Sequence, residues 1–398
     1  MTKHLMGLYN RAPIEVAEGQ GVWLTDVAGR RYLDCVGGIA TDALGHAHPR
    51  LIAALTDQAH KLWHVSNIFR IPGQEELARR LTEACFADVA YFANSGTEAV
   101  ECALKASRRY HAVGGQPERI DVIGFEGSFH GRTYAAVNAA GNPSYLDGFG
   151  PRLPGYVQLS IDDEAALAEA IARPTTAAVI IEPVQGEGGA RALPGPWLQR
   201  LRALTRAHGV LLIYDEVQSG MGRTGKLFAH QWFDDAAPDI MTIAKALGGG
   251  FPVGACLATS DAARGMTVGV HGSTFGGNPL AMAVALAAFD EIAKPETLKA
   301  ARSASAYFVE GLNAVRSRYP DVIAEVRGKG LLLGLKMHPN NREFMGLARD
   351  AGLLIAGGGE NCVRLLPSLL ISDAEIDEAL IRLADACAAA RAAMAQAA

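Results

Sequence analysis

Apolar runs alternate with amphipathic stretches between about residue 75 and about residue 260 of the chain. The amphipathic stretches, such as TEAVECALKASRRYH and PGPWLQRLRALTRAHG, carry apolar residues at helical spacing and predict helices. The apolar runs are short, rich in Val, Ile and Leu and bounded by loops, which predicts strands buried on both faces. They are ADVAYFANS, RIDVIGFEG, TAAVIIEP, VLLIYDE, PDIMTIAK and VGACLATS. This order predicts the α/β class, with a large, mostly parallel sheet covered by helices.

The pattern changes after GGNPLAMAVALAAFDEIA, which predicts a long helix. Beyond about residue 300 the chain predicts a helix, a strand (GLLLGLKM), a helix, a strand (CVRLLPSLL) and an alanine-rich final helix. Near the start, GVWLTDVAGRRYLD predicts a hairpin. We therefore expect residues 56–290 to form a large domain and residues 291–398 a smaller α+β domain, with residues 1–55 packed on the smaller one.

Composition and charge narrow the function without identifying it. The 398 residues are 49% hydrophobic and 20% charged, which is ordinary for a globular protein. The net charge of −5 does not point to a nucleic acid or an anionic membrane surface as partner. No apolar run reaches the roughly 18 residues that span a bilayer, and the first residues lack the apolar core of a signal peptide. We expect a cytoplasmic protein.

Neither the cysteines nor the histidines predict a metal site. The six cysteines form no CxxC pair or other metal-ligand spacing, so we expect reduced, mostly buried thiols. His46 with His48, and His60 with His64, have spacings that metal sites use, but no Cys or carboxylate completes either set in the sequence.

The stretch DEVQSGMGRTGKL contains GMGRTG, which matches the GxGxxG pattern of a dinucleotide-binding turn and nearly matches a P-loop. In a dinucleotide-binding fold the first glycine directly follows the strand, whereas here four residues separate Asp215 from Gly220. A P-loop needs Ser or Thr where this chain has Leu227. A glycine-rich surface loop explains the stretch better than either nucleotide site.

Polar residues stand where four predicted strands end, at Ser95, Glu182, Asp215 and Lys245. In a sheet of this class, ligands bind beyond the carboxyl ends of the strands. Burial of Lys245 would lower its pKa and allow it to form a Schiff base with a carbonyl, but a surface lysine is the alternative. A buried Asp215 needs a partner, which is either the pyridinium nitrogen of pyridoxal phosphate or a structural cation. Gln218, three residues on, could then hydrogen-bond the phenolic oxygen of that cofactor.

Ser95-Gly96-Thr97 lies between a predicted strand and a predicted helix with Glu98 in its first turn. Backbone N–H groups at a helix N-terminus, together with two hydroxyls, suit a phosphate dianion. The same three residues also make an ordinary helix N-cap.

Motifs of one family extend over nearly the whole chain. They are SGTEA, GSFHGRT, IIEPVQGEGG, LLIYDEVQSGMGRTG, DIMTIAKALGGGFPVGA and HGSTFGGNP, in this order, with YLDCVGGIATDALGHAHP before them and VRLLPSLLI after them. Together they resemble the class III aminotransferases that depend on pyridoxal 5'-phosphate (PLP). The resemblance implies fold type I, with a large mostly parallel sheet domain and a smaller α+β domain, and a ping-pong amino transfer.

The resemblance also implies roles for cofactor-binding residues. Lys245 would bond the aldehyde of PLP and move the proton during the reaction. Asp215 would pair with the pyridine nitrogen and Gln218 would contact the phenolic oxygen. Phe129 would stack on the ring, with His130 beside it.

Phosphate binding would fall to Ser95, Gly96 and Thr97, joined by Thr274 from the neighbouring subunit. That last role implies a homodimer with shared active sites.

Two arginines resemble the carboxylate-binding residues of the family, which suits their planar bidentate geometry. Arg364 would bind the α-carboxylate of glutamate or 2-oxoglutarate, and Arg132 the far carboxylate of either substrate. Glu187 would pair with Arg364 when an ω-amine binds and release it for glutamate. For either arginine alone, a surface salt bridge is the alternative.

Within the family the motifs are most similar to those of enzymes that transfer the δ-amino group of N-acetylornithine to 2-oxoglutarate. The products would be N-acetylglutamate semialdehyde and glutamate, as in arginine biosynthesis. Succinylornithine, succinyl-diaminopimelate, ornithine and 4-aminobutyrate stay open as substrates, and a nucleotide-dependent dehydrogenase is the alternative from another class. Thr97, Val100 and Asp42 stand where such enzymes more often have Ala, Asn and Asn, which weakens the assignment of one substrate.

Overall fold

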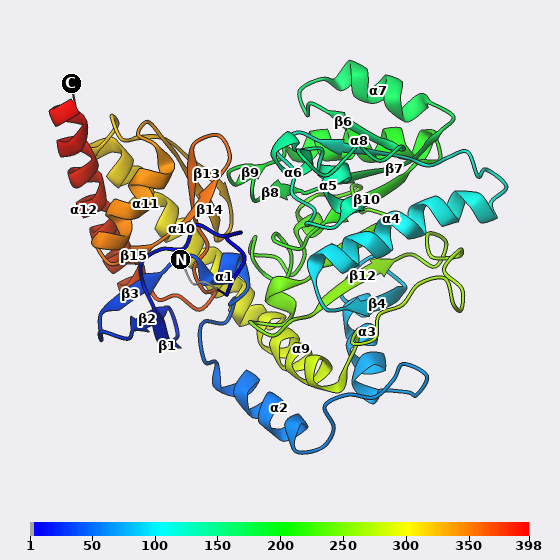
Figure 1. Ribbon diagram of the computed structural model, residues 1–398, viewed down its shortest axis with the longest axis horizontal. Coiled ribbons are helices and arrows are strands. Elements are labelled where there is room, and N and C mark those ends of the chain that lie inside the picture. The colour runs from blue at the N-terminus through cyan, green and yellow to red at the C-terminus, as the bar shows by residue number, and fades with distance from the viewer. Residues whose placement is uncertain (1–3, 398) are drawn as a thin grey trace.

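The computed structural model describes residues 4–397, which form two regions side by side (Figure 1). The region on the right of Figure 1 contains a sheet with the strand order β4-β12-β11-β10-β7-β5-β6. From β11 to β6 neighbouring strands run parallel, which confirms the predicted mostly parallel sheet. The strands are β4 (Val89–Ala93), β5 (Asp121–Phe125), β6 (Tyr156–Leu159), β7 (Thr176–Ile181), β10 (Leu211–Asp215), β11 (Ile240–Ile243) and β12 (Gly254–Ala258).

Strand β12 runs antiparallel to both of its neighbours, β11 and β4. Only residues 244–253 separate β11 from β12. A parallel return needs a crossover of a dozen or more residues, so this short connection forces β12 to reverse. The apolar run of β12 does not show its direction, which explains why the sequence could not predict the reversal.

Helices cover both faces of this sheet, and consecutive strand residues enter different cores. Val122 packs with α4 (Gly96–Val113) and α5 (Tyr134–Ala140), while Ile123 packs with α7 (Glu164–Ala172) and α8 (Gly195–Ala207). The same alternation separates Leu211 from Leu212. Because successive side chains of a strand point to opposite faces, burial of both faces produces the continuous apolar runs of the sequence.

The region on the left of Figure 1 contains two four-stranded sheets with helices packed beside them. One sheet has the order β1-β2-β3-β15 and the other the order β13-β14-β17-β16. Their strands are β1 (Val16–Gln20), β2 (Trp23–Asp26), β3 (Arg31–Asp34), β13 (Ile323–Lys329), β14 (Leu332–Met337), β15 (Leu353–Leu354), β16 (Ala356–Gly358) and β17 (Cys362–Leu365). The helices are α10 (Pro295–Arg318), α11 (Asn341–Asp350) and α12 (Asp373–Ala397).

Both ends of the chain contribute to this second region. Strand β3 pairs with β15, with Leu33 opposite Leu353, and the predicted hairpin is present as the antiparallel pair β2 and β3. Helix α2 (Pro49–Ala59) packs instead on α9 (Pro279–Ile292). The pairing of β3 with β15 supports assigning residues 1–55 to the smaller domain, and the boundary at residue 55 remains a proposal.

Shorter elements connect these units. They are α1 (Gly37–Ala40), α3 (Pro72–Glu83), α6 (Pro143–Leu146), β8 (Val184–Gln185), β9 (Arg191–Ala192) and the 3₁₀ turns η1 (Ala229–Trp232) and η2 (Lys245–Leu247). No helix among residues 4–397 is both long enough and apolar enough to cross a membrane.

The GMGRTG loop lies against the second region of the same chain. Gly222 has φ +84°, and a Cβ there would meet the side chain of Leu369 at 2.8 Å. Arg223 is fully buried and donates from Nη1 to the carbonyl oxygens of Leu331 and Pro367. The glycines therefore permit close packing of the two regions, and the loop has no phosphate-binding geometry.

Candidate active site

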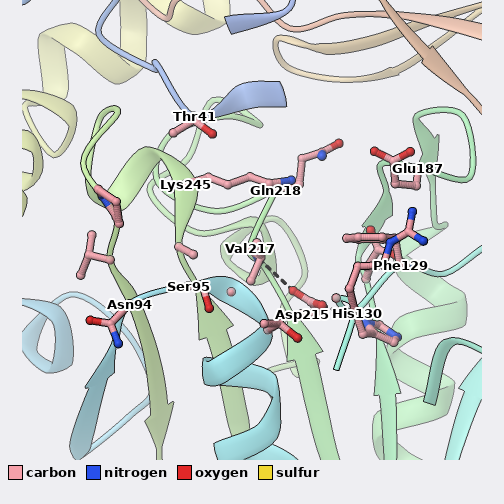
Figure 2. A pocket seen from close by; sticks show the side chains of 18 of the residues that line it. Thr41, Asn94, Ser95, Phe129, His130, Glu187, Asp215, Val217, Gln218 and Lys245 are labelled. Carbon is pink, nitrogen blue, oxygen red and sulfur yellow. Dashed lines mark hydrogen bonds and ion pairs between the residues drawn. The ribbon is translucent and has the colours of Figure 1, made fainter. Parts of the chain in front are cut away.

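A cavity of about 430 Å³ lies at the carboxyl ends of β4, β7, β10 and β11 (Figure 2). The predicted site residues that line it are Ser95, Gly96, Thr97, Phe129, His130, Arg132, Glu187, Asp215, Gln218 and Lys245. Arg364 is hydrogen-bonded to Glu187 and Gln218. Thr274 is exposed and does not line the cavity.

Asp215 is the last residue of β10 and is only 3% exposed. Its Oδ1 accepts hydrogen bonds from the backbone N–H of Val217 at 3.0 Å and from Thr242 Oγ1 at 3.1 Å. Its Oδ2 lies 2.8 Å from Nδ1 of His130 (Figure 2). Burial alone would lower the pKa of His130, but the hydrogen bond and charge of Asp215 raise it above the usual value. The pair therefore brings a carboxylate and an imidazole together at the floor of the cavity.

Lys245 follows β11 and has φ +48°, a left-handed conformation that non-glycine residues adopt at a cost of about 1–3 kcal/mol. Figure 2 shows its side chain extended across the cavity towards Gln218. Burial, followed by the charge of Arg364, lowers the pKa of Lys245 to about 8. About a tenth of its amine is therefore neutral at pH 7, far more than for an ordinary lysine, and a neutral amine is a nucleophile and a base.

Glu182 follows β7 and holds two loops that border the cavity. Its Oε1 accepts from the backbone N–H of Phe129 at 2.8 Å, and its Oε2 accepts from the backbone N–H of Gly186 at 3.0 Å. Burial is the largest influence on its carboxyl group and raises its pKa. The sequence placed Glu182 at a strand end but assigned it no role, because the two N–H donors depend on loop conformations that the sequence does not show.

The N-terminus of α4 points into the cavity. Ser95 caps the helix, with its Oγ accepting from the backbone N–H of Glu98 at 3.3 Å. Gly96 leaves room for Val217, whose Cγ1 lies 2.8 Å from where a Cβ would be. Thr97 is not free, because its Oγ1 lies 3.1 Å from Oγ1 of Thr133. Backbone N–H groups and the partial positive charge of the helix end give this corner the properties that suit an anion.

Arg364 and Glu187 form an ion pair at one side of the cavity. Arg364 Nη2 donates to Glu187 Oε1 at 2.7 Å, and Nη1 donates to Gln218 Oε1 at 3.3 Å. Nε and Nη2 also donate to the carbonyl oxygen of Gly357. Arg364 is 2% exposed whereas the Glu187 side chain is 33% exposed. The arginine is therefore fixed by its surroundings, and the glutamate is the partner that can swing away.

Arg132 approaches the cavity from the loop after β5. Its guanidinium carbon lies 3.6 Å from the centre of the Tyr145 ring and 5.5 Å from the centre of the Phe129 ring. Phe129 and Tyr145 meet edge to face at 6.0 Å. Within residues 4–397, no carboxylate lies within ion-pair distance of Arg132. Its charge is therefore available to a carboxylate ligand.

The cavity lining includes residues to which the sequence assigned no role, among them Thr41, Asn94, Glu182 and Val217. Asn94 precedes the helix cap and donates from Nδ2 to Glu98 Oε1 at 3.0 Å. Val217 lies between Asp215 and Gln218 in the sequence. Because both of these residues were expected in the site, Val217 could have been expected to line it as well. Thr41 comes from the N-terminal part of the chain, and no spacing in the sequence links it to the site.

The sequence profile of the family described as Aminotransferase class-III matches residues 8–387. The chain belongs to the class III aminotransferases. It is 65% identical to acetylornithine aminotransferase 2 of Caulobacter vibrioides, with 98% of this chain and 96% of the relative covered. This membership confirms the family resemblance of the motifs and the transaminase assignment. It therefore excludes the alternative of a nucleotide-dependent dehydrogenase.

Solved structures show the same fold as this class III aminotransferase. The N-acetylornithine aminotransferase of Stenotrophomonas maltophilia has a TM-score of 0.85 at 38% identity, covering 97% of this chain and 98% of the other. The ornithine aminotransferase of Toxoplasma gondii, in which PLP partly occupies the active site, has a TM-score of 0.91 at 33% identity, covering 96% and 91%. The predicted fold type I is thereby confirmed.

Proposed function

We propose that this class III aminotransferase uses PLP to transfer the δ-amino group of N-acetylornithine to 2-oxoglutarate, giving N-acetylglutamate semialdehyde and glutamate. This reaction belongs to arginine biosynthesis, and we place the enzyme in the cytoplasm. The observation that carries the chemistry is the cavity that holds the Lys245 amine, the Asp215 carboxylate and the N-terminus of α4 together. The high identity to a relative named acetylornithine aminotransferase supports the substrate.

The residues present fit PLP. A cavity of about 430 Å³ is within the usual range for a small ligand. The N-terminus of α4 suits the phosphate, and Asp215 offers a buried carboxylate to the ring nitrogen. When bound, PLP supplies an aldehyde that bonds amines and a ring that withdraws electrons from the substrate carbon.

Asp215 would hold a proton on the ring nitrogen of PLP. Two donors fix its Oδ1, so its carboxylate plane cannot rotate away from His130. His130 holds Oδ2 from the other side, and its own Nε2 lacks a partner within the described residues. Lys245 Nζ is placed to take the proton from the substrate carbon that bears the amine and to return it, because its lowered pKa leaves it partly neutral.

Glu187 allows one cavity to bind two different substrates in turn. While Glu187 neutralises Arg364, the cavity offers no free cation there and admits the uncharged methylene chain of an ω-amine. When glutamate or 2-oxoglutarate enters, its α-carboxylate takes Arg364 and Glu187 turns outwards. Arg132 binds the second carboxylate of these dicarboxylates and the α-carboxylate of N-acetylornithine.

We also propose a homodimer in which Thr274 of each subunit completes the phosphate site of the other. Thr274 is exposed and lies next to the exposed side chain of Phe275. Trp63, Ile68 and Phe69 are further exposed apolar residues. Their segment is tied to the Thr274 loop, because Asn67 Nδ2 donates to the carbonyl oxygens of Ser273 and Gly276. An apolar surface of this kind favours a protein partner.

The test is a comparison of kcat/KM for N-acetylornithine, succinylornithine, succinyl-diaminopimelate, ornithine and 4-aminobutyrate with 2-oxoglutarate as acceptor. N-acetylornithine should exceed ornithine and 4-aminobutyrate by about tenfold or more. A higher value for ornithine would overturn the substrate while leaving the transaminase assignment in place.

A further inference from the structure

A second cavity, of about 410 Å³, lies away from the active site among α4, the edge strand β4, its neighbour β12, and the loop after β12. It is lined by apolar side chains such as Val89 and Met266, together with Cys102, Cys256 and His271. None of these residues takes part in the proposed transamination. Two thiols and an imidazole in one cavity are a chemically reactive combination.

The two thiols come from different elements and line the same cavity. Cys256 lies in β12 directly opposite Tyr91 of β4, on the sheet face that α4 covers. Cys102 lies on the side of α4 that packs on this face, in the same buried cluster as Cys256, and both residues line the cavity. Cys102 is 3% exposed and Cys256 is 4% exposed, so both sulfurs reach solvent only through the cavity.

Two basic side chains stand beside Cys102. Lys105 Nζ lies 3.0 Å from Nδ1 of His271 and donates to the carbonyl oxygen of Val270 at 3.0 Å. The ammonium group of Lys105 can only donate, so Nδ1 of His271 accepts this hydrogen bond. The proton of the neutral His271 ring is therefore on Nε2. The ring of His271 is held against Tyr91 at 4.9 Å. Its Nε2–H is the donor that remains for another partner, and His271 and Cys102 line the same cavity.

These neighbours favour a thiolate at Cys102. The adjacent Cys256 thiol lowers the pKa of Cys102, His271 and Lys105 lower it further, and burial opposes them without cancelling them. Interaction with Cys102, together with burial, raises the pKa of Cys256, since a second negative charge beside the first is unfavourable. One of the two sulfurs is thus a nucleophile and the other remains a thiol.

We propose that Cys102 and Cys256 form a thiol switch in which Cys102 reacts with a hydroperoxide and Cys256 closes a disulfide. The Cys102 thiolate attacks one peroxide oxygen, the O–O bond breaks, and hydroxide leaves and is protonated by solvent. Cys256 then gives its proton to solvent and attacks the Cys102 sulfur, and the S–O bond breaks with loss of water. Two thiols and one hydrogen peroxide become one disulfide and two waters.

Cys85 provides an internal control for accessibility. It is more exposed than Cys102, but burial is the largest influence on its thiol and raises its pKa to about 11, with Glu216 and Asp88 nearby. If exposure alone controlled reactivity, Cys85 would react before Cys102. If the basic neighbours control it, the order is reversed.

The first experiment treats the holoenzyme with iodoacetamide over a range of pH and measures alkylation of all six cysteines by peptide mass spectrometry. Cys102 should react about tenfold faster than Cys85 near neutral pH. Lys105→Met should move the midpoint of its pH profile upwards by about one unit, and Lys105→Arg should leave it near the wild-type position. Two results would overturn the assignment of Cys102 as the reactive thiol. One is faster labelling of Cys85, and the other is a midpoint for Cys102 that Lys105→Met does not move.

The second experiment exposes the holoenzyme to hydrogen peroxide and maps its peptides without reduction. A linked pair of peptides carrying Cys102 and Cys256 is expected, and reduction should release it. In Cys256→Ser, Cys102 should instead proceed to sulfinic acid. Sulfinic acid at Cys102 in the wild type, with no linked pair, would reject Cys256 as the resolving residue. These masses do not depend on the substrate, so they test the switch separately from the proposed function.

Discussion

Arg364 and Glu187 are 177 positions apart in the chain, yet Arg364 Nη2 donates to Glu187 Oε1 at 2.7 Å. The arginine is almost completely buried and is also bound to the carbonyl oxygen of Gly357 and to Gln218. Its position is therefore set without the glutamate. The glutamate decides only whether the positive charge is neutralised, and this is the property that two half-reactions with different substrates require.

Glu187→Gln should separate the two half-reactions. The substitution keeps the shape of the side chain but leaves the charge of Arg364 uncompensated. We expect kcat/KM for N-acetylornithine to fall about tenfold, about 1.4 kcal/mol, while KM for 2-oxoglutarate stays equal or falls. Single-turnover absorbance changes with each substrate measure the two halves separately.

Glu360→Gln is the matched control for this experiment. Glu360 pairs with Arg327 at 2.7 Å, is more exposed than Glu187 and does not line the active-site cavity. Glu360→Gln should leave the rates of both half-reactions unchanged. An equal loss in both half-reactions of Glu187→Gln would contradict a gating role and indicate general damage to the site.

Lys245→Ala should abolish turnover and the visible absorbance of covalently held PLP, because no other amine is placed at that position of the cavity lining. Lys329→Ala is a suitable control. Burial lowers the pKa of Lys329 too, but its amine lies 4.3 Å from the centre of the Trp232 ring, outside the cavity. A Lys245→Ala enzyme with normal absorbance and rate would reject the proposed chemistry.

The lowered pKa of Lys245 gives a pH dependence. Only the neutral amine attacks a carbonyl, so attachment of PLP to the cofactor-free protein should accelerate as pH rises through about 8. An ordinary lysine would show this rise near pH 10.4. Arg364→Met removes the second largest cause of the lowering and should move the midpoint upwards. Stopped-flow absorbance measures the midpoint, and one near 10 in the wild type would contradict the buried state of the amine.

Asp215→Asn should retain the shape of the cavity but lose the charge that keeps the ring nitrogen protonated. We expect kcat to fall by about 10²–10⁴, in the range seen when a proton-handling group is removed. Phosphate binding by α4 does not involve Asp215, so PLP should still be retained, though less tightly. Absorbance titration with PLP and steady-state rates distinguish the two effects, and an unchanged kcat would exclude the proposed role.

The sequence predicted the residues at the strand ends better than the residues on the surrounding loops. Asp215 and Lys245 follow apolar strands, and parallel strands bring their carboxyl ends to one edge, so their meeting followed from the pattern. The pairing of Arg364 with Glu187 came only from the family resemblance, since nothing local joins residues so far apart. Phosphate binding by Thr97 stays a prediction, and the contact of its hydroxyl with Thr133 could not be foreseen because it depends on the loop after β5.

Glu182 is the residue whose role only the structure showed, and Glu182→Gln tests it. An amide can accept from one of the two N–H groups, of Phe129 and Gly186, but its NH₂ group must face the other. The loop carrying Phe129 should loosen, with a loss of about 1–3 kcal/mol in the free energy of unfolding. An exposed carboxylate, Glu325, gives a neutral control as Glu325→Gln.

The pH dependence of this loss follows from the pKa of Glu182, which is raised in the folded protein. A raised pKa means that the folded state binds the proton more tightly than the unfolded state. The resulting stabilisation is complete below the unfolded pKa of about 4.3 and is lost as pH rises through the folded value. The stability advantage of the wild type over Glu182→Gln should therefore shrink between about pH 4.5 and neutrality. Thermal unfolding of both cofactor-free proteins across this range measures it, and an advantage that grows with pH would show that the carboxylate is stabilised in its charged form.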